Sequence, residues 1–425
     1  MGSDIIVGLD IGTSKVCSIA AEVNAKGVSL LGVGTSPSAG IRKGTIVNID
    51  AAVDSIKKAV RDAESFSGTK IKSVYVGITG AHIKGFNSSG AVGVRGKEIK
   101  AADVVRAIDS AKTVYIPLDR EVLHVIPAEF VVDGQEGIVN PVGMSGVRLE
   151  ANVHIITGAA SSMQNLLKCC EKAGLEVVDI VLKPLASAYS TLTEDEKEFG
   201  AVLIDIGAGT TDIALFRDGY LKQISLLGIG GSHITNDIAI GLRVNMNEAE
   251  RLKKTSGASF AASTDNSEEI HINQPGGEDR IMPKKYLTEI IQPRCEEMLE
   301  LIKGELKASL AYELATCGVV LTGGTARLNG FDRMAESLLG LPVRIGMPSN
   351  TYGMGSVVGS PVYSTGVGLV AYAAESDLNR RSSPEILGEV FGRMKEGIKG
   401  AFRYIYFLNL NSRKEGGILC LKSRK

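Results

Sequence analysis

The chain has 425 residues, of which 44% are hydrophobic, 5% are aromatic and none is tryptophan. This length predicts roughly two to four compact units, with cores built mainly from aliphatic side chains. The formal net charge of −1 excludes a nucleic-acid-binding surface covering the molecule. The cysteines form no C-x-x-C pair and no apolar run reaches 18 residues, which excludes a cysteine-rich metal site and a transmembrane helix, so we expect a cytoplasmic protein.

The strongest pattern is a repeat of segment 7–13 at segment 202–208, 195 residues further along the chain. Each copy is an apolar strand followed by an aspartate, an apolar residue, a glycine and a small residue. Small or hydroxylated residues and a second apolar run come next, which predicts a β-hairpin in each copy. The duplication predicts two related halves that face each other across a cleft.

The tips of these hairpins carry residue types that bind phosphate. Glycines let backbone N–H groups approach an anion, hydroxyls donate hydrogen bonds, and Lys15 adds a positive charge. Asp10 and Asp205 end the first strands and suit Mg²⁺ held through water. One such turn alone is commonly a plain hairpin, whereas a matched pair favours a phosphate site. The predicted phosphate-binding residues are Gly12, Thr13, Ser14, Lys15, Gly207, Ala208, Gly209, Thr210 and Thr211.

Between the two hairpins, hydrophobic periodicity predicts alternating strands and helices, and residues 85–165 predict an inserted α+β module. The predicted strands are 29–36, 72–78, 122–132, 149–158 and 176–182. The predicted helices are 51–65, 101–113, 161–173 and 184–192.

The second half is rich in helix from 232 to 311, interrupted by a polar loop or hairpin at 261–280. Segment 247–254 predicts a charged helix, either a solvated face or part of a ligand site. Segment 319–327 is an apolar strand ending in two glycines, where a flat base or ribose can lie against the backbone. The polar segment 375–388 predicts a linker.

Five of these segments, in this order, resemble motifs of the actin, Hsp70 and sugar-kinase superfold: 10–15, 183–189, 205–212, 319–327 and 364–369. The resemblance implies an α/β, actin-like (ribonuclease H-like) duplicated fold, with two lobes around a nucleotide cleft and an inserted α+β subdomain in the first lobe. It implies ATP and Mg²⁺ as cofactors. The residues it adds to the nucleotide site are Glu250, Lys253, Lys254, Gly323, Gly324, Thr325 and Arg327.

Segment 140–154 closely resembles part of the FtsA family of bacterial cell-division proteins, as do 321–324 and 363–369. The resemblance implies an ATP-binding protein that polymerises and tethers the tubulin-like GTPase FtsZ to the inner face of the cytoplasmic membrane at the division site. It further implies that the inserted subdomain recruits later division proteins. Chaperones of this fold carry a glutamate where this chain has Lys183, so we expect ATP turnover to be slow at most.

Segment 290–294 resembles the family's peptide-binding helix. The resemblance implies that Arg294, and more weakly Lys285, contact the acidic C-terminal peptide of FtsZ. An ordinary solvated helix face is the alternative.

The end of the chain predicts an amphipathic helix that lies on anionic lipids, with a helix docked on the protein as the alternative. Four basic residues add roughly 4 kcal/mol to its membrane binding. Its apolar face comprises Phe391, Met394, Ile398, Phe402 and Ile405, and its basic face Arg393, Lys395, Lys399 and Arg403.

The motifs imply these divisions: first lobe 1–84 and 166–200, inserted subdomain 85–165, second lobe core 201–231 and 312–360, helical outer subdomain 232–311, second connecting helix 361–374, linker 375–388, and membrane helix with basic tail 389–425. Two other functions stay open: an actin-like protein of type IV pilus assembly and a small-molecule kinase of the same superfold. The sequence shows no further group of carboxylates that would act on a hydroxyl substrate, which disfavours the kinase.

Overall fold

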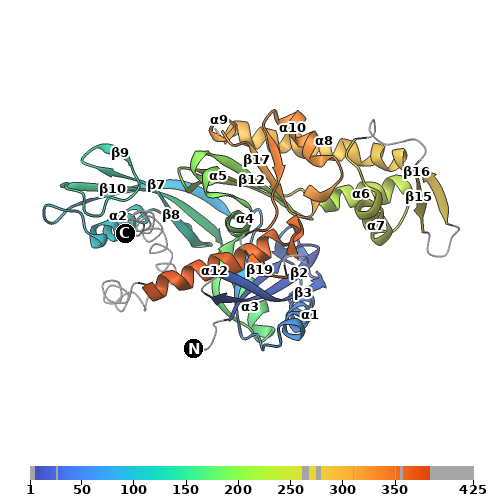
Figure 1. Cartoon of the computed structure of the whole chain (residues 1–425), viewed down its shortest axis with the longest axis horizontal. Helices are drawn as coiled ribbons and strands as arrows, with labels where there is room; N and C mark the ends of the chain where they lie inside the picture. Colours follow the sequence, from blue (N-terminus) through green and yellow to red (C-terminus); the bar gives the residue numbers. More distant parts are fainter. Residues whose placement is uncertain are drawn as a thin grey trace, which may run out of the picture. The chain divides into compact units, whose positions relative to one another are not determined.

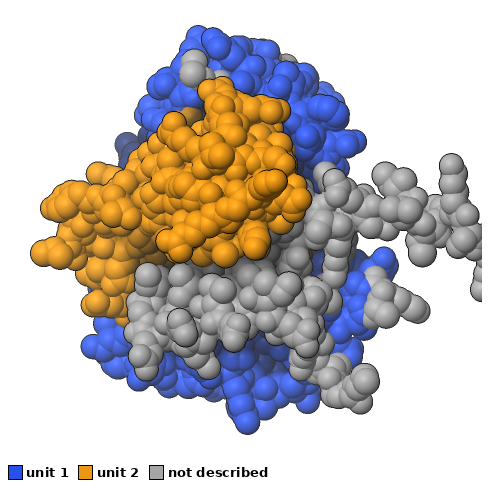
Figure 2. Space-filling view, turned by 90° about the vertical axis from the view of Figure 1, so that its left-hand side faces the viewer, with its two compact units in different colours: residues 1–81, 165–219, 224–371 blue, residues 82–164, 220–223, 372–425 orange. Residues whose placement is uncertain are grey.

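The computed structural model describes residues 5–24, 27–260, 268–273, 279–309, 311–349, 351–354 and 358–382. The chain divides into two compact units, coloured separately in Figure 2. Unit 1 comprises residues 1–81, 165–219 and 224–371, and unit 2 comprises residues 82–164, 220–223 and 372–425.

Unit 1 contains both predicted hairpins, which the structure confirms. The first joins β1 (Ile5–Ile11) to β2 (Lys15–Asn24), with Asp10 opposite Cys17. The second joins β12 (Ala201–Ile206) to β13 (Thr211–Arg217), with Asp205 opposite Asp212. Both turns are short. Each begins with a glycine, Gly12 or Gly207, whose N–H donates a hydrogen bond to the backbone carbonyl three residues later.

Each hairpin belongs to a mixed sheet, and the two sheets share one strand order. The order β11-β6-β1-β2-β3 in the first corresponds to β18-β17-β12-β13-β14 in the second, which confirms the predicted duplication. Figure 1 labels β2, β3 and β19 in the first sheet and β12 and β17 in the second. The first sheet adds β19 at its edge. The other strands are β3 (Gly27–Pro37), β6 (Ser73–Ile78), β11 (Glu176–Leu182), β14 (Tyr220–Leu227), β17 (Val319–Thr322), β18 (Val343–Ile345) and β19 (Thr351–Gly353). Two small hairpins are β4 (Ile41–Arg42) with β5 (Thr45–Ile46), and β15 (Glu269–Ile272) with β16 (Arg280–Pro283).

Helices cover these sheets, and α6, α8 and α10 share one apolar cluster with the second sheet. Ile204, Leu299 and Phe331 are fully buried in that cluster, and burying each such side chain contributes about 1.5–3 kcal/mol. The helices are α1 (Ile49–Ser67), α3 (Ala160–Lys172), α4 (Lys183–Thr191), α5 (Glu194–Phe199), α6 (Gly231–Leu242), α7 (Met246–Ser256), α8 (Lys284–Ala308), α9 (Ala311–Leu314), α10 (Phe331–Leu339) and α12 (Ser364–Ser382), with 3₁₀ turns η2 (Thr325–Arg327) and η3 (Pro361–Tyr363).

Unit 2 has the predicted α+β composition of the inserted module. Its four-stranded antiparallel sheet has the order β7-β10-β8-β9. The core contains alternate residues of β10, among them Leu149 and Val153, packed with Val104 and Ile108 of α2. The elements are β7 (Lys84–Gly93), α2 (Ala101–Ala111), β8 (Arg120–Val132), β9 (Gln135–Ile138) and β10 (Arg148–Ala159).

One sequence expectation is wrong at the end of the described chain. Helix α12 continues to Ser382, eight residues into the segment 375–388 that was expected to be a linker. Residues 375–382 are mostly polar but contain neither proline nor glycine, and the first proline after them is Pro384. Polarity alone therefore does not end the helix.

The predicted membrane helix and basic tail, 389–425, lie outside the described residues. In the part of the chain that the structure describes, none of the helices combines the length and apolar composition that crossing a bilayer requires.

Candidate functional site

A cavity of about 530 Å³ lies in unit 1, with walls from both hairpins. The two tips approach so closely that a Cβ added to Gly209 would lie 2.7 Å from Thr13 Oγ1. The expected residues that line the cavity are Asp10, Gly12, Thr13, Ser14, Lys15, Asp205, Gly207, Ala208, Gly209, Thr210, Glu250, Lys253, Lys254, Gly323, Gly324, Thr325 and Arg327.

Thr211 is the exception among the expected residues. It is fully buried, and its hydroxyl donates a hydrogen bond of 2.9 Å to the carbonyl oxygen of Ile229. Thr211 is the first residue of β13, where successive side chains point to opposite sides, so it faces away from the cavity that Thr210 lines.

The first hairpin tip is held by its own backbone and by neighbouring segments. The N–H of Gly12 donates to the carbonyl of Lys15 at 2.9 Å, and Thr13 Oγ1 accepts from the N–H of Gly44 at 3.2 Å. Lys15 Nζ donates to the carbonyl of Val362 at 2.7 Å and lies 3.9 Å from the centre of the Tyr363 ring. Burial lowers the pKa of Lys15, although the carboxylates of Asp10 and Asp205 act in the opposite direction. The lysine is therefore fixed in place at the cavity wall.

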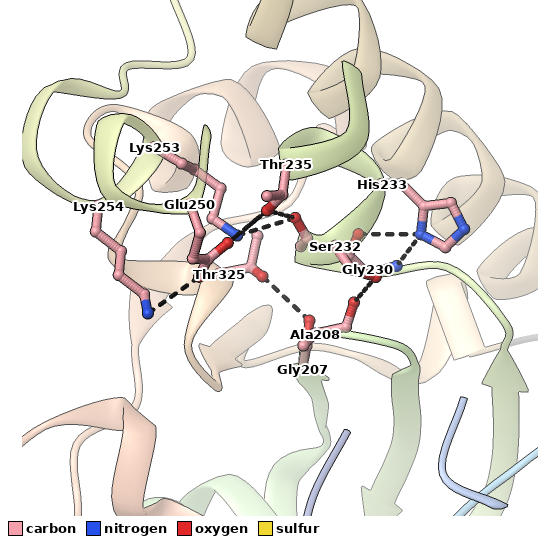
Figure 3. Close-up of polar contacts among 11 residues, drawn as sticks. Gly207, Ala208, Gly230, Ser232, His233, Thr235, Glu250, Lys253, Lys254 and Thr325 are labelled. Atoms are coloured by element: carbon pink, nitrogen blue, oxygen red, sulfur yellow. Dashed lines mark hydrogen bonds and ion pairs between the residues drawn. The ribbon is translucent and has the colours of Figure 1, made fainter. Parts of the chain in front are cut away.

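The second tip is tied to the start of α6, as Figure 3 shows. The carbonyl of Gly207 accepts from the N–H of Gly231 at 2.9 Å and from Thr325 Oγ1 at 3.2 Å. Ser232 donates to the carbonyl of Ala208 from its N–H at 2.8 Å and from its hydroxyl at 2.6 Å. Since the carbonyls of this tip are occupied on the α6 side, the tip is a rigid part of the cavity wall.

Helix α7 supplies a charged wall, drawn in Figure 3. Glu250 lies 2.7 Å from Lys253 and 3.1 Å from Lys254. Lys253 also donates to the carbonyl of Gly231 at 2.9 Å and to Thr235 Oγ1 at 2.8 Å, which fastens α7 to α6. Burial acts to raise the pKa of Glu250, but the Lys253 charge and hydrogen bonds outweigh it and hold that pKa below its ordinary value. The carboxylate is therefore ionised at neutral pH.

The strand end at Gly323 completes the floor. Gly323 has φ +86°, and an added Cβ would overlap the carboxylate of Asp205. Only glycine fits this position. The next residue, Gly324, is exposed and offers a flat backbone surface to a ligand.

Three buried carboxylates lie near the hairpin tips, which form the predicted phosphate end of the cavity. Asp10 Oδ1 lies 2.7 Å from Lys183 Nζ, and Asp205 Oδ2 accepts from Ser187 at 2.8 Å and Thr365 at 3.2 Å. Burial raises the pKa of Asp205. These donors leave a poor fit for Mg²⁺ shared by Asp10 and Asp205, because an ammonium group already neutralises the first and two hydroxyls bond the second. No cluster of three or more metal-ligating side chains occurs among the described residues.

The third carboxylate, Asp212, was not predicted to line the site. It accepts a hydrogen bond of 2.6 Å from Thr79, and burial followed by the nearby Asp205 charge raises the pKa of Asp212 to about 7. Asp212 directly follows Thr210 and Thr211 in the sequence, and this position next to predicted phosphate-binding residues already indicated that it belongs to the site. Thr79 gave no such signal, since a segment far away in the chain brings it here. Lys183 lies in the predicted connecting-helix motif 183–189, but its pairing with Asp10 was not expected.

The expected peptide contacts, Arg294 and Lys285, lie on α8 and are not among the residues that line the cavity. Arg294 forms ion pairs with Asp237 of α6, at 2.5 Å, and with Glu297 of its own helix. Lys285 is half-buried near the start of α8, and no ion pair joins it to another described residue. The expected membrane residues are all outside the described residues.

Family models match two parts of the chain. The model for cell division protein FtsA matches residues 202–368, and the model for the SHS2 domain inserted in FtsA matches residues 80–157. The FtsA of Pseudomonas aeruginosa is 43% identical over 409 residues, which cover 94% of this chain and 98% of that protein. The FtsA of Escherichia coli is 37% identical over 391 residues, covering 90% of this chain and 93% of that protein.

Solved structures with similar folds have much lower sequence identity. The PilM–PilN complex of type IV pilus biogenesis has a TM-score of 0.63 at 16% identity, covering 87% of this chain and 98% of that chain. MreB 5 of Spiroplasma citri bound to AMPPNP has a TM-score of 0.56 at 15% identity, covering 90% and 99%. The MamK double helical filament has a TM-score of 0.50 at 14% identity, covering 87% and 98%.

These structural similarities show an actin-like fold alone, so the likeness to the pilus protein does not extend to its function. The identity to FtsA proteins, by contrast, extends over most of the chain. This chain therefore belongs to the FtsA family of cell division proteins.

Proposed function

We propose that this chain binds ATP in the unit 1 cavity, assembles into actin-like filaments and tethers FtsZ to the membrane through its C-terminal tail. The observation that carries the nucleotide proposal is the meeting of two mirrored glycine turns, at Gly12 and Gly207, on one cavity. Backbone N–H groups in such turns attract phosphate, and Lys15 supplies a fixed positive charge beside them. The related fold of MreB 5, solved with AMPPNP, supports the same ligand class.

The first experiment measures ATP binding by isothermal titration. We expect Lys15→Gln to weaken binding by about 10- to 150-fold, the equivalent of losing about 1.5–3 kcal/mol of charged hydrogen bonding. The matched control is Lys172→Gln, an exposed lysine of α3 that pairs with Asp50 at 3.0 Å and does not line the cavity. Equal affinity of both variants would contradict the assignment of Lys15.

Slow turnover is the second part of the nucleotide proposal. Lys183 stands where chaperones of this fold carry a glutamate that helps position the attacking water, and a lysine ammonium cannot accept a proton from that water. We expect phosphate release to remain far slower than nucleotide exchange, measured in single-turnover experiments.

Self-assembly and membrane attachment are proposed from the fold and from the tail sequence. The filament of MamK supports an actin-like assembly. We expect the full chain with ATP to sediment with anionic liposomes, and a version ending at Gly388 to stay in solution. Neutral liposomes are the control, because the basic residues contribute only at an anionic surface. Equal sedimentation of the two versions would remove the tether from the proposal.

The FtsZ peptide is proposed to dock on α8 near Arg294 and Lys285, and the inserted subdomain to recruit later division proteins. Since Asp237 already neutralises Arg294, we expect Asp237→Asn to strengthen binding of the acidic peptide and Lys285→Glu to weaken it, measured by fluorescence polarisation. Lys307→Glu is the matched control, since it makes the same charge change at the exposed far end of α8. If Lys307→Glu weakens binding as much as Lys285→Glu, only the net charge matters and the docking site is wrong.

A further inference from the structure

Lys183 is the first residue of α4, and its side chain enters the cavity at the phosphate end. Its Nζ lies 2.7 Å from Asp10 Oδ1 and donates a hydrogen bond of 2.8 Å to the carbonyl oxygen of Ile11. Only 7% of the residue is exposed, so the ammonium is held at one position instead of extending into solvent as lysines usually do.

The neighbouring strand is shaped to admit this side chain. A Cβ added to Gly77 of β6 would lie 3.1 Å from Lys183 Cγ and 3.4 Å from its Cε. Any larger side chain at position 77 would crowd the path that the lysine takes to Asp10. The lysine therefore occupies a built place in the fold.

The charges around this ammonium are mostly negative. Asp10 contacts it directly, and Asp205 and Asp212 line the same cavity. Burial raises the pKa of Asp205 and of Asp212, and the Lys183 charge acts against that rise at both residues. Such a group of carboxylates needs a cation nearby, and in phosphate sites a divalent metal commonly fills that role.

We infer that Lys183 is the resident cation of the phosphate site, and that it neutralises Asp10 in place of Mg²⁺. The inference rests on the proposed binding of ATP. It corrects the expectation that Asp10 and Asp205 hold Mg²⁺ through water, because Lys183 already neutralises Asp10. ATP therefore binds this chain with little dependence on Mg²⁺.

The test titrates the full chain with a fluorescent ATP analogue, once in Mg²⁺ and once in EDTA. For the wild-type chain we expect the two Kd values to agree within about threefold, because a protein charge does the neutralising in both conditions. For Lys183→Gln we expect removal of Mg²⁺ to weaken binding at least about tenfold, since Asp10 is then free to hold the hydrated metal. A tenfold or larger loss of wild-type binding in EDTA overturns the inference.

The matched control is Lys254→Gln, which removes one positive charge from the α7 wall of the same cavity. We expect this variant to change Kd by the same factor in Mg²⁺ and in EDTA. A gain of Mg²⁺ dependence equal to that of Lys183→Gln would mean that any lost cation is replaced by the metal, and would overturn the specific role of Lys183.

A second measurement leaves Lys183 unchanged, so its result does not depend on how a Lys183 variant folds. Mn²⁺ is added without nucleotide to the wild-type chain and to Asp10→Asn, and its binding is followed by electron paramagnetic resonance. We expect the wild-type chain to show no Mn²⁺ site that is lost in Asp10→Asn. Detection of such a site overturns the inference. Absence of ATP binding in both Mg²⁺ and EDTA contradicts the proposed function instead, and the Mn²⁺ experiment still decides whether Lys183 excludes a metal.

Discussion

At the residue scale, the buried carboxyl of Asp212 makes the stability of the fold depend on pH. The residue is 3% exposed and lies opposite Asp205 across the second hairpin. Because burial and the Asp205 charge raise its pKa from 3.8 to about 7, the folded chain holds this proton more tightly than the unfolded chain does. Stability linked to this group is therefore fully present below pH 3.8 and is lost as the pH rises to about 7.

The first prediction is that Asp212→Asn stabilises the chain at pH 8 and not at pH 4. The amide keeps an acceptor for Thr79 and cannot ionise, so the gain at pH 8 approaches an upper limit of about 4 kcal/mol. Urea unfolding at both pH values measures it. Asp218→Asn, at an exposed residue, is the control and should leave the pH profile unchanged. A gain of the same size at pH 4 and pH 8 would refute the titration of Asp212.

At the scale of elements, unit 1 depends on the close crossing of α4 and α12. A Cβ added to Gly368 of α12 would overlap the carbonyl oxygen of Ala186 in α4. The two helices touch backbone to backbone at this point, which places the hydroxyls of Ser187 and Thr365 against Asp205. The arrangement of the cavity floor therefore depends on the absence of a Cβ atom at Gly368.

The second prediction compares two glycine-to-alanine changes within helices. Gly368→Ala should lower the free energy of unfolding by about 1–3 kcal/mol, since the helices must separate to admit the methyl group. Gly304→Ala in α8 meets no atom within 4 Å and should raise it by about 0.5–1 kcal/mol through helix propensity. Denaturant titration measures both, and stabilisation by Gly368→Ala would show that the crossing is looser than described.

At the scale of the whole molecule, the cavity draws its walls from segments spread over most of unit 1, from Asp10 to Thr365. A ligand that fills it binds only the folded arrangement of both hairpins, α7 and the β17 end. Its binding free energy therefore adds to the stability of unit 1 as a whole.

The third prediction is that ATP stabilises the full chain by about 2.7 kcal/mol at a concentration of 100 times its Kd. In the proposed binding mode, adenosine would contact only the α7 and β17 end of the cavity, and tripolyphosphate only the hairpin tips. At the same molar concentration, each should therefore raise the melting temperature less than ATP does. Thermal unfolding with each compound measures the effect, and equal shifts for ATP and tripolyphosphate would mean that the α7 wall does not contact the base.

Local patterns predicted the hairpins and their glycine tips, because a strand, a tight turn and a second strand are encoded within about 15 residues of sequence. The Lys183–Asp10 pair was not predictable, since the two residues are joined only by the parallel neighbours β1, β6 and β11. Thr211 was misplaced because residue type suggested a donor, whereas strand alternation decides its direction. The end of α12 was misplaced because polar residues form helices as readily as linkers.

Helix α12 begins at the cavity floor and extends to Ser382. Its first turn is fastened there, with Thr365 donating to Asp205 and Ser364 Oγ accepting from Thr322 at 2.7 Å. Its 19 residues span about 28 Å at 1.5 Å per residue. One degree of tilt at Thr365 therefore displaces Ser382 by about 0.5 Å, treating the helix as a rod of that length. A small tilt of the first turn therefore becomes a larger displacement at the far end of the same helix.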